Sequence, residues 1–114
     1  MIVITVIVVG ALAAVARYLV TRAVPVPWGV LVVNVIGSAI GGVVLGLAER
    51  AAVGSDIRLI LITGLCGGLT TFSTFSVETI QLVTEGKVRR AALSVAGNLV
   101  LGIGAAAVGY LLSR

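Results

Sequence analysis

Residues 59–83 are long and apolar enough to cross the hydrocarbon core of a bilayer, which is roughly 30 Å thick, but their centre is unlike a plain membrane anchor. It reads GLCGGLTTFSTFS over residues 64–76 and combines glycines, hydroxyls and two phenylalanines. Gly67 and Gly68 weaken a helix. Within hydrocarbon, an interrupted backbone is tolerated only where protein or a polar cavity satisfies the freed groups. The segment therefore predicts a broken membrane helix that lines a polar space.

The composition places the rest of the chain in a membrane as well. Of 114 residues, 60% are hydrophobic, 11% are charged and none is histidine, and the mean hydropathy is +1.26. Apolar runs predict spans at about 2–21, 28–48, 59–83 and 91–113. No hydrophilic stretch is long enough for a second domain. We therefore expect an all-α membrane protein, a single four-helix transmembrane domain over residues 1–114, with its third helix broken at the centre.

Smaller features of the chain agree with this organisation. Arg17 and Arg22 lie at and after the end of the first apolar run, whereas the positive charge of a signal peptide precedes its apolar region. The single Cys66 excludes an intrachain disulfide and is expected to be a small buried residue. The net charge of +4 lies mainly in loops and at helix ends, where it indicates orientation and headgroup contact instead of nucleic-acid binding.

The second and fourth predicted spans carry stripes of polar and small residues. One face of the second span holds Asn34, Gly37, Ser38 and Gly41. The fourth span repeats such residues at every fourth position, namely Ser94, Asn98 and Gly102. Small residues spaced in this way allow another helix to approach closely.

Positive charge is divided almost evenly between the two sides of the membrane. The side of the termini holds Arg50, Arg58 and Arg114, and the other side holds Arg17, Arg22, Lys87, Arg89 and Arg90. With the N-terminal amine the division is about four against five, a bias too small to specify one orientation. Short loops alone would also produce a weak bias. If both orientations insert, two copies can pair antiparallel about a twofold axis in the membrane plane.

Such a pair would place two kinds of ion site at the break. Carbonyls around residues 67–70 from two chains would form an oxygen cage suited to a hard monovalent cation, and freed N–H groups would favour an anion nearby. Beyond the break, one helical face carries Thr71, Phe72, Phe75, Ser76, Glu78 and Thr79. Two ring edges would hold a small anion weakly enough to release it. The alternative is ordinary packing, with hydroxyls bonded back to their own helix.

Two ionisable residues inside the predicted spans have two interpretations each. Glu78 is a functional candidate because a carboxylate within a span is costly, but it lies close enough to the helix end to snorkel to the interface. Arg17 is either a structural arginine, snorkelling or salt-bridged, or the charge of a cationic vestibule that draws anions.

The run from Gly64 to Glu78 closely resembles the signature of the CrcB/Fluc fluoride channels, small bacterial membrane proteins that export fluoride. Asn34-Val-Ile-Gly37 is similar to the family's second-helix asparagine motif, Arg17-Tyr18 to its first-helix arginine and aromatic, and Glu85-Gly86 follows the third helix as in the family. The resemblance covers nearly the whole chain. It departs at Ala13 and Ala14, where the family is richer in glycine, and at Gly102, where some relatives carry a hydroxyl.

The resemblance implies an antiparallel dual-topology dimer in the bacterial inner membrane, with two fluoride pores and one structural sodium ion. It places the sodium on the backbone carbonyls of Gly67 and Thr70 from both chains, and Arg17 at the vestibule. The implied fluoride path comprises Asn34, Phe72, Ser73, Thr74, Phe75, Ser76, Glu78, Ser94 and Asn98. Fluoride would leave the cell passively and its toxicity would fall. The partner is a second copy of the chain or, as in some organisms of the family, an unlike subunit.

Two other functions fit a small four-span protein. A multidrug-type antiporter of cations and protons needs an acid within its first helix, and residues 2–21 contain none. A non-conducting assembly subunit needs only helix faces of small residues, which gives no reason for the sequence between Thr70 and Ser76. An enzyme is disfavoured because the chain has no histidine and no evident pair of nucleophile and base.

Overall fold

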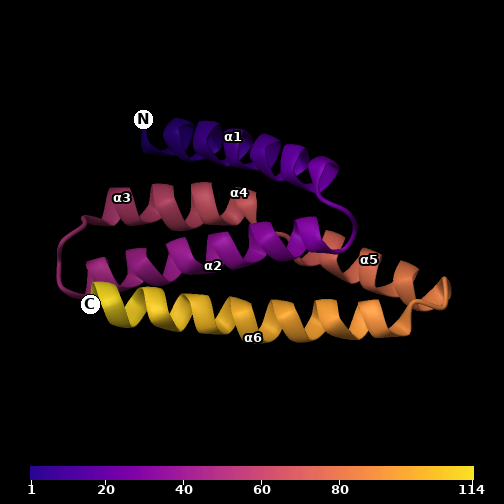
Figure 1. The fold of residues 1–114 in the computed structure, drawn as a ribbon. Helices are drawn as coiled ribbons and strands as arrows, with labels where there is room; N and C mark the ends of the chain where they lie inside the picture. The colour runs from indigo at the N-terminus through magenta and orange to yellow at the C-terminus, as the bar shows by residue number, and fades with distance from the viewer.

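The computed structural model describes residues 1–114 as four long rods of helix (Figure 1). Three rods are continuous helices: α1 (Ile2–Ala23), α2 (Trp28–Glu49) and α6 (Val88–Ser113). The third rod consists of α3 (Ser55–Leu59), the π-helical segment η1 (Ile60–Cys66), α4 (Gly67–Leu69) and α5 (Phe72–Thr84). All four rods are long and apolar enough to span a membrane. The protein is thus an all-α, multi-pass membrane protein, and both termini lie at one end (Figure 1).

The helices extend beyond the apolar runs that predicted them. The third rod begins at Ser55 instead of residue 59, and the fourth at Val88 instead of residue 91. The added turns are polar, and Asp56 lies in the first turn of α3, where a carboxylate interacts favourably with the helix dipole. Apolar runs mark the hydrocarbon thickness, whereas a helix continues into the headgroup region.

Close contacts through glycine join α2 to α6, which lie side by side along their length (Figure 1). A Cβ atom on Gly42 would overlap the backbone of Ala106, and one on Gly109 would lie 2.7 Å from the Ala39 carbonyl oxygen. Gly68 plays the same part between the third rod and α1, because a Cβ there would lie 2.5 Å from the Gly10 carbonyl oxygen. These glycines set the distances between the rods.

We expect Gly42→Ala to lower the free energy of unfolding by about 1–3 kcal/mol, because the added methyl meets backbone and not a side chain that can move aside. Gly104→Ala is the matched control: a Cβ there meets nothing within 4 Å, so higher helix propensity should leave it neutral or slightly more stable. Denaturant titration of both variants in detergent measures the difference. Equal stabilities would contradict the close contact between α2 and α6.

The break in the third rod lies at Thr70 and Thr71, a few residues after Gly67 and Gly68, the glycines expected to interrupt the helix. Gly67 and Gly68 are helical, whereas Thr70 (ψ 156°) and Thr71 (φ −149°, ψ 124°) are extended. Position 68 requires glycine because the backbone there packs closely against α1 and leaves no room for a Cβ atom. After the break, α5 continues to the end of the molecule where α6 begins (Figure 1).

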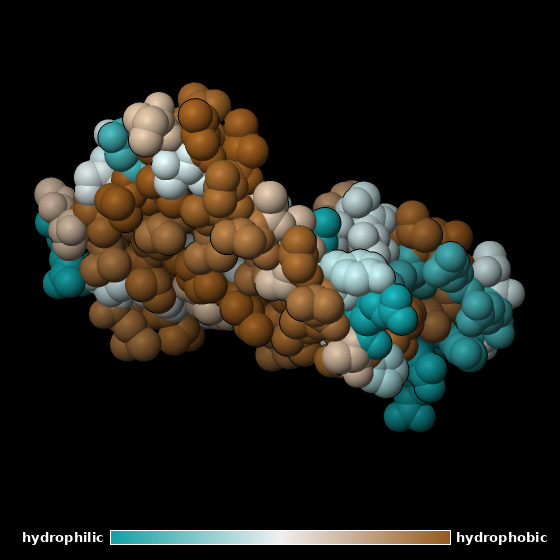
Figure 2. All heavy atoms as spheres, turned by 90° about the horizontal axis from the view of Figure 1, so that it is seen from above, coloured by the Kyte–Doolittle hydropathy of each residue, from teal (hydrophilic) through white to brown (hydrophobic).

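The surface outside these contacts is apolar over most of the body (Figure 2). Hydrophilic residues gather at the ends, most densely where α5 meets α6 (Figure 2). Side chains such as Val3, Leu12, Ile103 and Leu112 are exposed, although they are large and hydrophobic. Lipid or a second membrane protein would cover this apolar surface.

Candidate functional site

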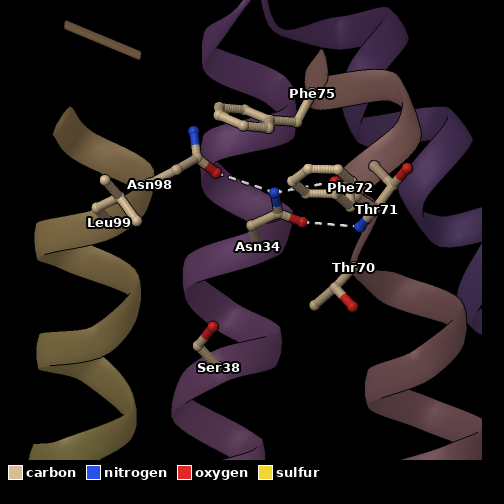
Figure 3. Close-up of a pocket in the computed structure, with 8 residues that line it drawn as sticks. All are labelled: Asn34, Ser38, Thr70, Thr71, Phe72, Phe75, Asn98 and Leu99. Carbon is tan, nitrogen blue, oxygen red and sulfur yellow. Dashed lines mark hydrogen bonds between the residues drawn. The ribbon is translucent and has the colours of Figure 1, made fainter. Parts of the chain in front are cut away.

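Asn34 of α2 holds the broken backbone by hydrogen bonds to both backbone polar groups of Thr71, the N–H and the C=O. Its Oδ1 accepts the Thr71 N–H at 2.8 Å, and its Nδ2 donates to the Thr71 carbonyl at 3.2 Å. An interrupted helix in hydrocarbon must have these groups satisfied from outside the helix. One amide side chain satisfies both, and this is why the chain can leave helical geometry here (Figure 3).

The same amide extends to the fourth rod. Asn34 Nδ2 also donates to Asn98 Oδ1 of α6 at 2.9 Å (Figure 3). Asn98 Nδ2 in turn donates to the Ser94 carbonyl at 2.8 Å, and the Ser94 side chain is buried. A continuous chain of amide groups therefore runs from α6 through α2 to the break.

Arg17 of α1 holds the break from another direction. Its Nη1 donates to the carbonyls of Gly68 at 3.0 Å and Thr70 at 3.2 Å. These carbonyls lie at the carboxyl end of α4, where a positive charge interacts favourably with the exposed C=O groups. The guanidinium is thus in direct contact with the break, which favours the structural interpretation of Arg17 over a free charge in a vestibule.

Thr71 also begins the next helix. Its Oγ1 accepts the Thr74 N–H at 3.2 Å as an N-cap, and it lies 3.2 Å from Thr74 Oγ1 and 3.3 Å from Ser73 Oγ. A threonine cap satisfies one of the free N–H groups in the first turn of a helix. Ser73 and Thr74 therefore belong to a hydroxyl cluster at the positive end of α5.

A cavity of about 320 Å³ opens beside the break. Its lining residues are Asn34, Ser38, Thr70, Thr71, Phe72, Phe75, Asn98 and Leu99 (Figure 3). The rings of Phe72 and Phe75 lie 5.9 Å apart between centroids at an interplanar angle of 46°, and Phe72 is 80% exposed. The cavity thus has amide and hydroxyl groups on one wall and two aromatic rings on another.

The structure brings only some of the predicted path residues to this cavity. Asn34, Phe72, Phe75 and Asn98 line it, and Ser73, Thr74 and Ser94 lie in the hydrogen-bond network beside it. The Ser76 hydroxyl donates to the Phe72 carbonyl at 2.9 Å, which is bonding back to its own helix. Glu78 lies outside the cavity, and its Oε1 is buried without a hydrogen-bond partner.

Some residues of the cavity were not assigned to the path by the sequence. Thr71 was placed only on the helical face after the break, although a threonine before a helical run is a recognisable N-cap signal. Ser38 belongs to the polar face of α2 that includes Asn34. Leu99 carries no signal, because it resembles every other aliphatic residue of α6.

The carbonyl of Gly67 receives no hydrogen bond from the N–H groups of Thr70 and Thr71 at the break. The Thr70 N–H donates to the Cys66 carbonyl at 3.0 Å, and the Thr71 N–H donates to Asn34, so neither donates to Gly67. No cluster of three or more acidic, cysteine or histidine side chains exists to hold a metal ion. A cation at the break would therefore meet neutral carbonyl oxygens, which are ligands that suit a hard cation.

These features define a small polytopic membrane protein with a polar cavity at a broken helix. Residues 4–110 match the family model described as CrcB-like protein, camphor resistance. The chain therefore belongs to the CrcB-like family, which confirms the resemblance carried by the central run.

Similar proteins come from several organisms. The protein of Nitrobacter winogradskyi named fluoride-specific ion channel FluC is 42% identical over 112 residues, which cover 92% of this chain and 89% of that protein. Proteins of the same name from Phocaeicola vulgatus and Pyrococcus abyssi are 40% and 43% identical, over 92% of this chain and 92% and 89% of their own lengths.

Proposed function

We propose that this protein is a fluoride channel and that fluoride passes the cavity beside the break. Proteins named fluoride-specific ion channels are similar to this chain over nearly its whole length. The family is one of channels and not of enzymes. The observation that carries the proposal is the combination of Asn34, Asn98 and two phenylalanine rings in one membrane cavity.

The cavity suits a small anion that must lose water. Fluoride is compact and strongly hydrated, so a pore has to replace its water contacts with other donors. Amide N–H groups, hydroxyls and the positive edges of aromatic rings supply them. None carries a full charge, so the anion is bound weakly enough to leave, as conduction requires. A membrane potential that is negative inside then drives fluoride outward without covalent chemistry, which lowers its toxicity.

A second copy of the chain would complete this path. One chain leaves Phe72 80% exposed and the cavity open to the outside. An antiparallel partner across the break would cover both, and the nearly even distribution of positive charge permits the two orientations that this dimer needs. We infer an antiparallel homodimer with one cavity from each chain.

The same dimer would bring two pairs of carbonyls, from Gly67 and Thr70 of each chain, to a shared sodium ion. The freed Gly67 carbonyl supports this assignment. The positive charge of Arg17 beside the Thr70 carbonyl opposes it electrostatically, so a monovalent ion fits better than a divalent one. Sodium would supply a fixed positive charge that holds the two breaks together.

Fluoride efflux from liposomes that contain only this purified chain tests the function. We expect efflux of fluoride, read with a fluoride electrode, without matching efflux of chloride. Phe75→Ile should reduce it by about tenfold or more, because it removes a ring edge worth about 1.4 kcal/mol to the passing anion.

Leu101→Ile is the matched control, since Leu101 is 53% exposed and lies outside the cavity. It should leave efflux unchanged. Equal rates for Phe75→Ile and the unaltered chain would remove the ring from the path. No efflux from a folded dimer would contradict the self-sufficient channel and direct the search to an unlike partner subunit.

A further inference from the structure

A second cavity, of about 300 Å³, lies where α2 and α6 begin, and it shares no lining residue with the cavity beside the break. Its lining residues are Trp28, Lys87, Arg89, Arg90 and Leu93. Its basic residues lie at the start of α6, at the end of the molecule where α5 meets α6. Hydrophilic residues gather at this end (Figure 2). The conduction path proposed above uses none of these residues.

The positive charge of this basic cavity is hardly balanced by the chain itself. Lys87 pairs with Glu85 at 3.5 Å, and this is the only ion pair in the structure. Arg89 and Arg90 are exposed and have no carboxylate partner, and the first turn of α6 contains no acidic residue. Cations in the first turn of a helix also oppose its dipole. An anion bound here would relieve both repulsions.

The rest of the lining is apolar and continues into the membrane surface. Trp28 is half-buried at the first residue of α2, and Leu93 is 51% exposed one turn after the arginines. Tryptophan at a helix end is typical of the level of the lipid headgroups. A ligand that fits both parts therefore has an anionic head and an apolar body.

We propose that the basic cavity binds the headgroup of an anionic phospholipid, with its phosphate on Arg89 and Arg90 and its acyl chains along Leu93. Basic cavities between membrane helices are suited to such headgroups, and each Lys or Arg contributes about fivefold to the binding of anionic lipid. The site does not depend on fluoride conduction.

Trp28 provides the measurement, because it is the only tryptophan of the chain and lines the cavity. The purified protein is reconstituted in phosphatidylcholine vesicles that contain a fixed fraction of lipid brominated on its acyl chains, either phosphatidylglycerol or phosphatidylcholine. Brominated lipid quenches tryptophan fluorescence on contact. We expect phosphatidylglycerol to quench Trp28 more strongly at equal mole fraction, with a binding preference of about fivefold or more.

Arg89→Gln/Arg90→Gln should reduce the preference to about one. Arg50→Gln/Arg114→Gln is the matched control, because it removes the same charge at the opposite end of the rods and should retain the preference. An equal loss in both double variants would overturn the site in favour of general charge attraction. Equal quenching by the two lipids in the unaltered protein would also overturn it. Inorganic phosphate that abolishes the preference at constant ionic strength would identify a free-anion site instead.

Discussion

Replacing Asn34 with leucine is expected to lower the free energy of unfolding by about 2–6 kcal/mol. The amide of Asn34 is the partner of both the N–H and the C=O of Thr71. Leucine has nearly the same size but leaves both groups unpaired inside the membrane, at a cost of about 1–3 kcal/mol each. Denaturant titration of the protein in detergent measures the loss, and fluoride efflux from liposomes should disappear with it.

Asn98→Leu is the informative comparison, because Asn98 bonds Asn34 but does not touch the broken backbone. It should cost only about 1–3 kcal/mol, because it loses the hydrogen bonds to Asn34 and to Ser94, each with a usual net value of about 0.5–1.5 kcal/mol. The double variant should be only about 0.5–1.5 kcal/mol less stable than Asn34→Leu alone, since the bond between the two residues is lost once and only the bond of Asn98 to Ser94 is lost in addition. If Asn98→Leu proved as damaging as Asn34→Leu, the break would not depend on the Thr71 contacts.

The existence of the break followed from the sequence, but its position did not. Glycines and hydroxyls within an apolar span are visible in a linear chain, and they predicted an interrupted third helix. The position is decided by Asn34, which is 37 residues away from Thr71 and contributes both hydrogen bonds. Gly67 and Gly68 suggested the wrong point because their effect is local, whereas Gly68 is needed for a contact with Gly10.

The candidate site shows the same division between local and distant information. The polar stripe of Asn34 and Ser38 and the phenylalanines after the break were visible as patterns, and they meet in one cavity. The helical face predicted for α5 included more residues than those that line the cavity. The Ser76 hydroxyl bonds back to the Phe72 carbonyl, and Glu78 lies outside the cavity. Which residues of a face meet a cavity depends on the neighbouring helices, and a single sequence does not specify their rotation.

The contact of Arg17 with the break gives the second large expected effect. Arg17→Gln should lower the free energy of unfolding by about 3 kcal/mol, because each of its two hydrogen bonds from a charged donor is worth about 1.5–3 kcal/mol and the side chain is partly exposed. The vestibule interpretation predicts instead unchanged stability, with a fluoride flux below that of the unaltered chain at low salt. This difference should shrink at high salt, because salt screens the attraction that Arg17 would exert in the unaltered chain.

Arg22→Gln is the matched control for Arg17→Gln, since it removes the same charge from α1 but breaks only exposed contacts with Tyr18, a hydrogen bond to its hydroxyl and a cation–π contact with its ring. It should cost less than about 1 kcal/mol. Arg17→Lys separates charge from geometry, because lysine keeps the charge without the planar fork that reaches two carbonyls. Its stability should fall between those of the unaltered chain and Arg17→Gln. If Arg17→Gln and Arg22→Gln were equally stable, the hydrogen bonds to Gly68 and Thr70 would contribute nothing to holding the break, and the vestibule interpretation would replace them.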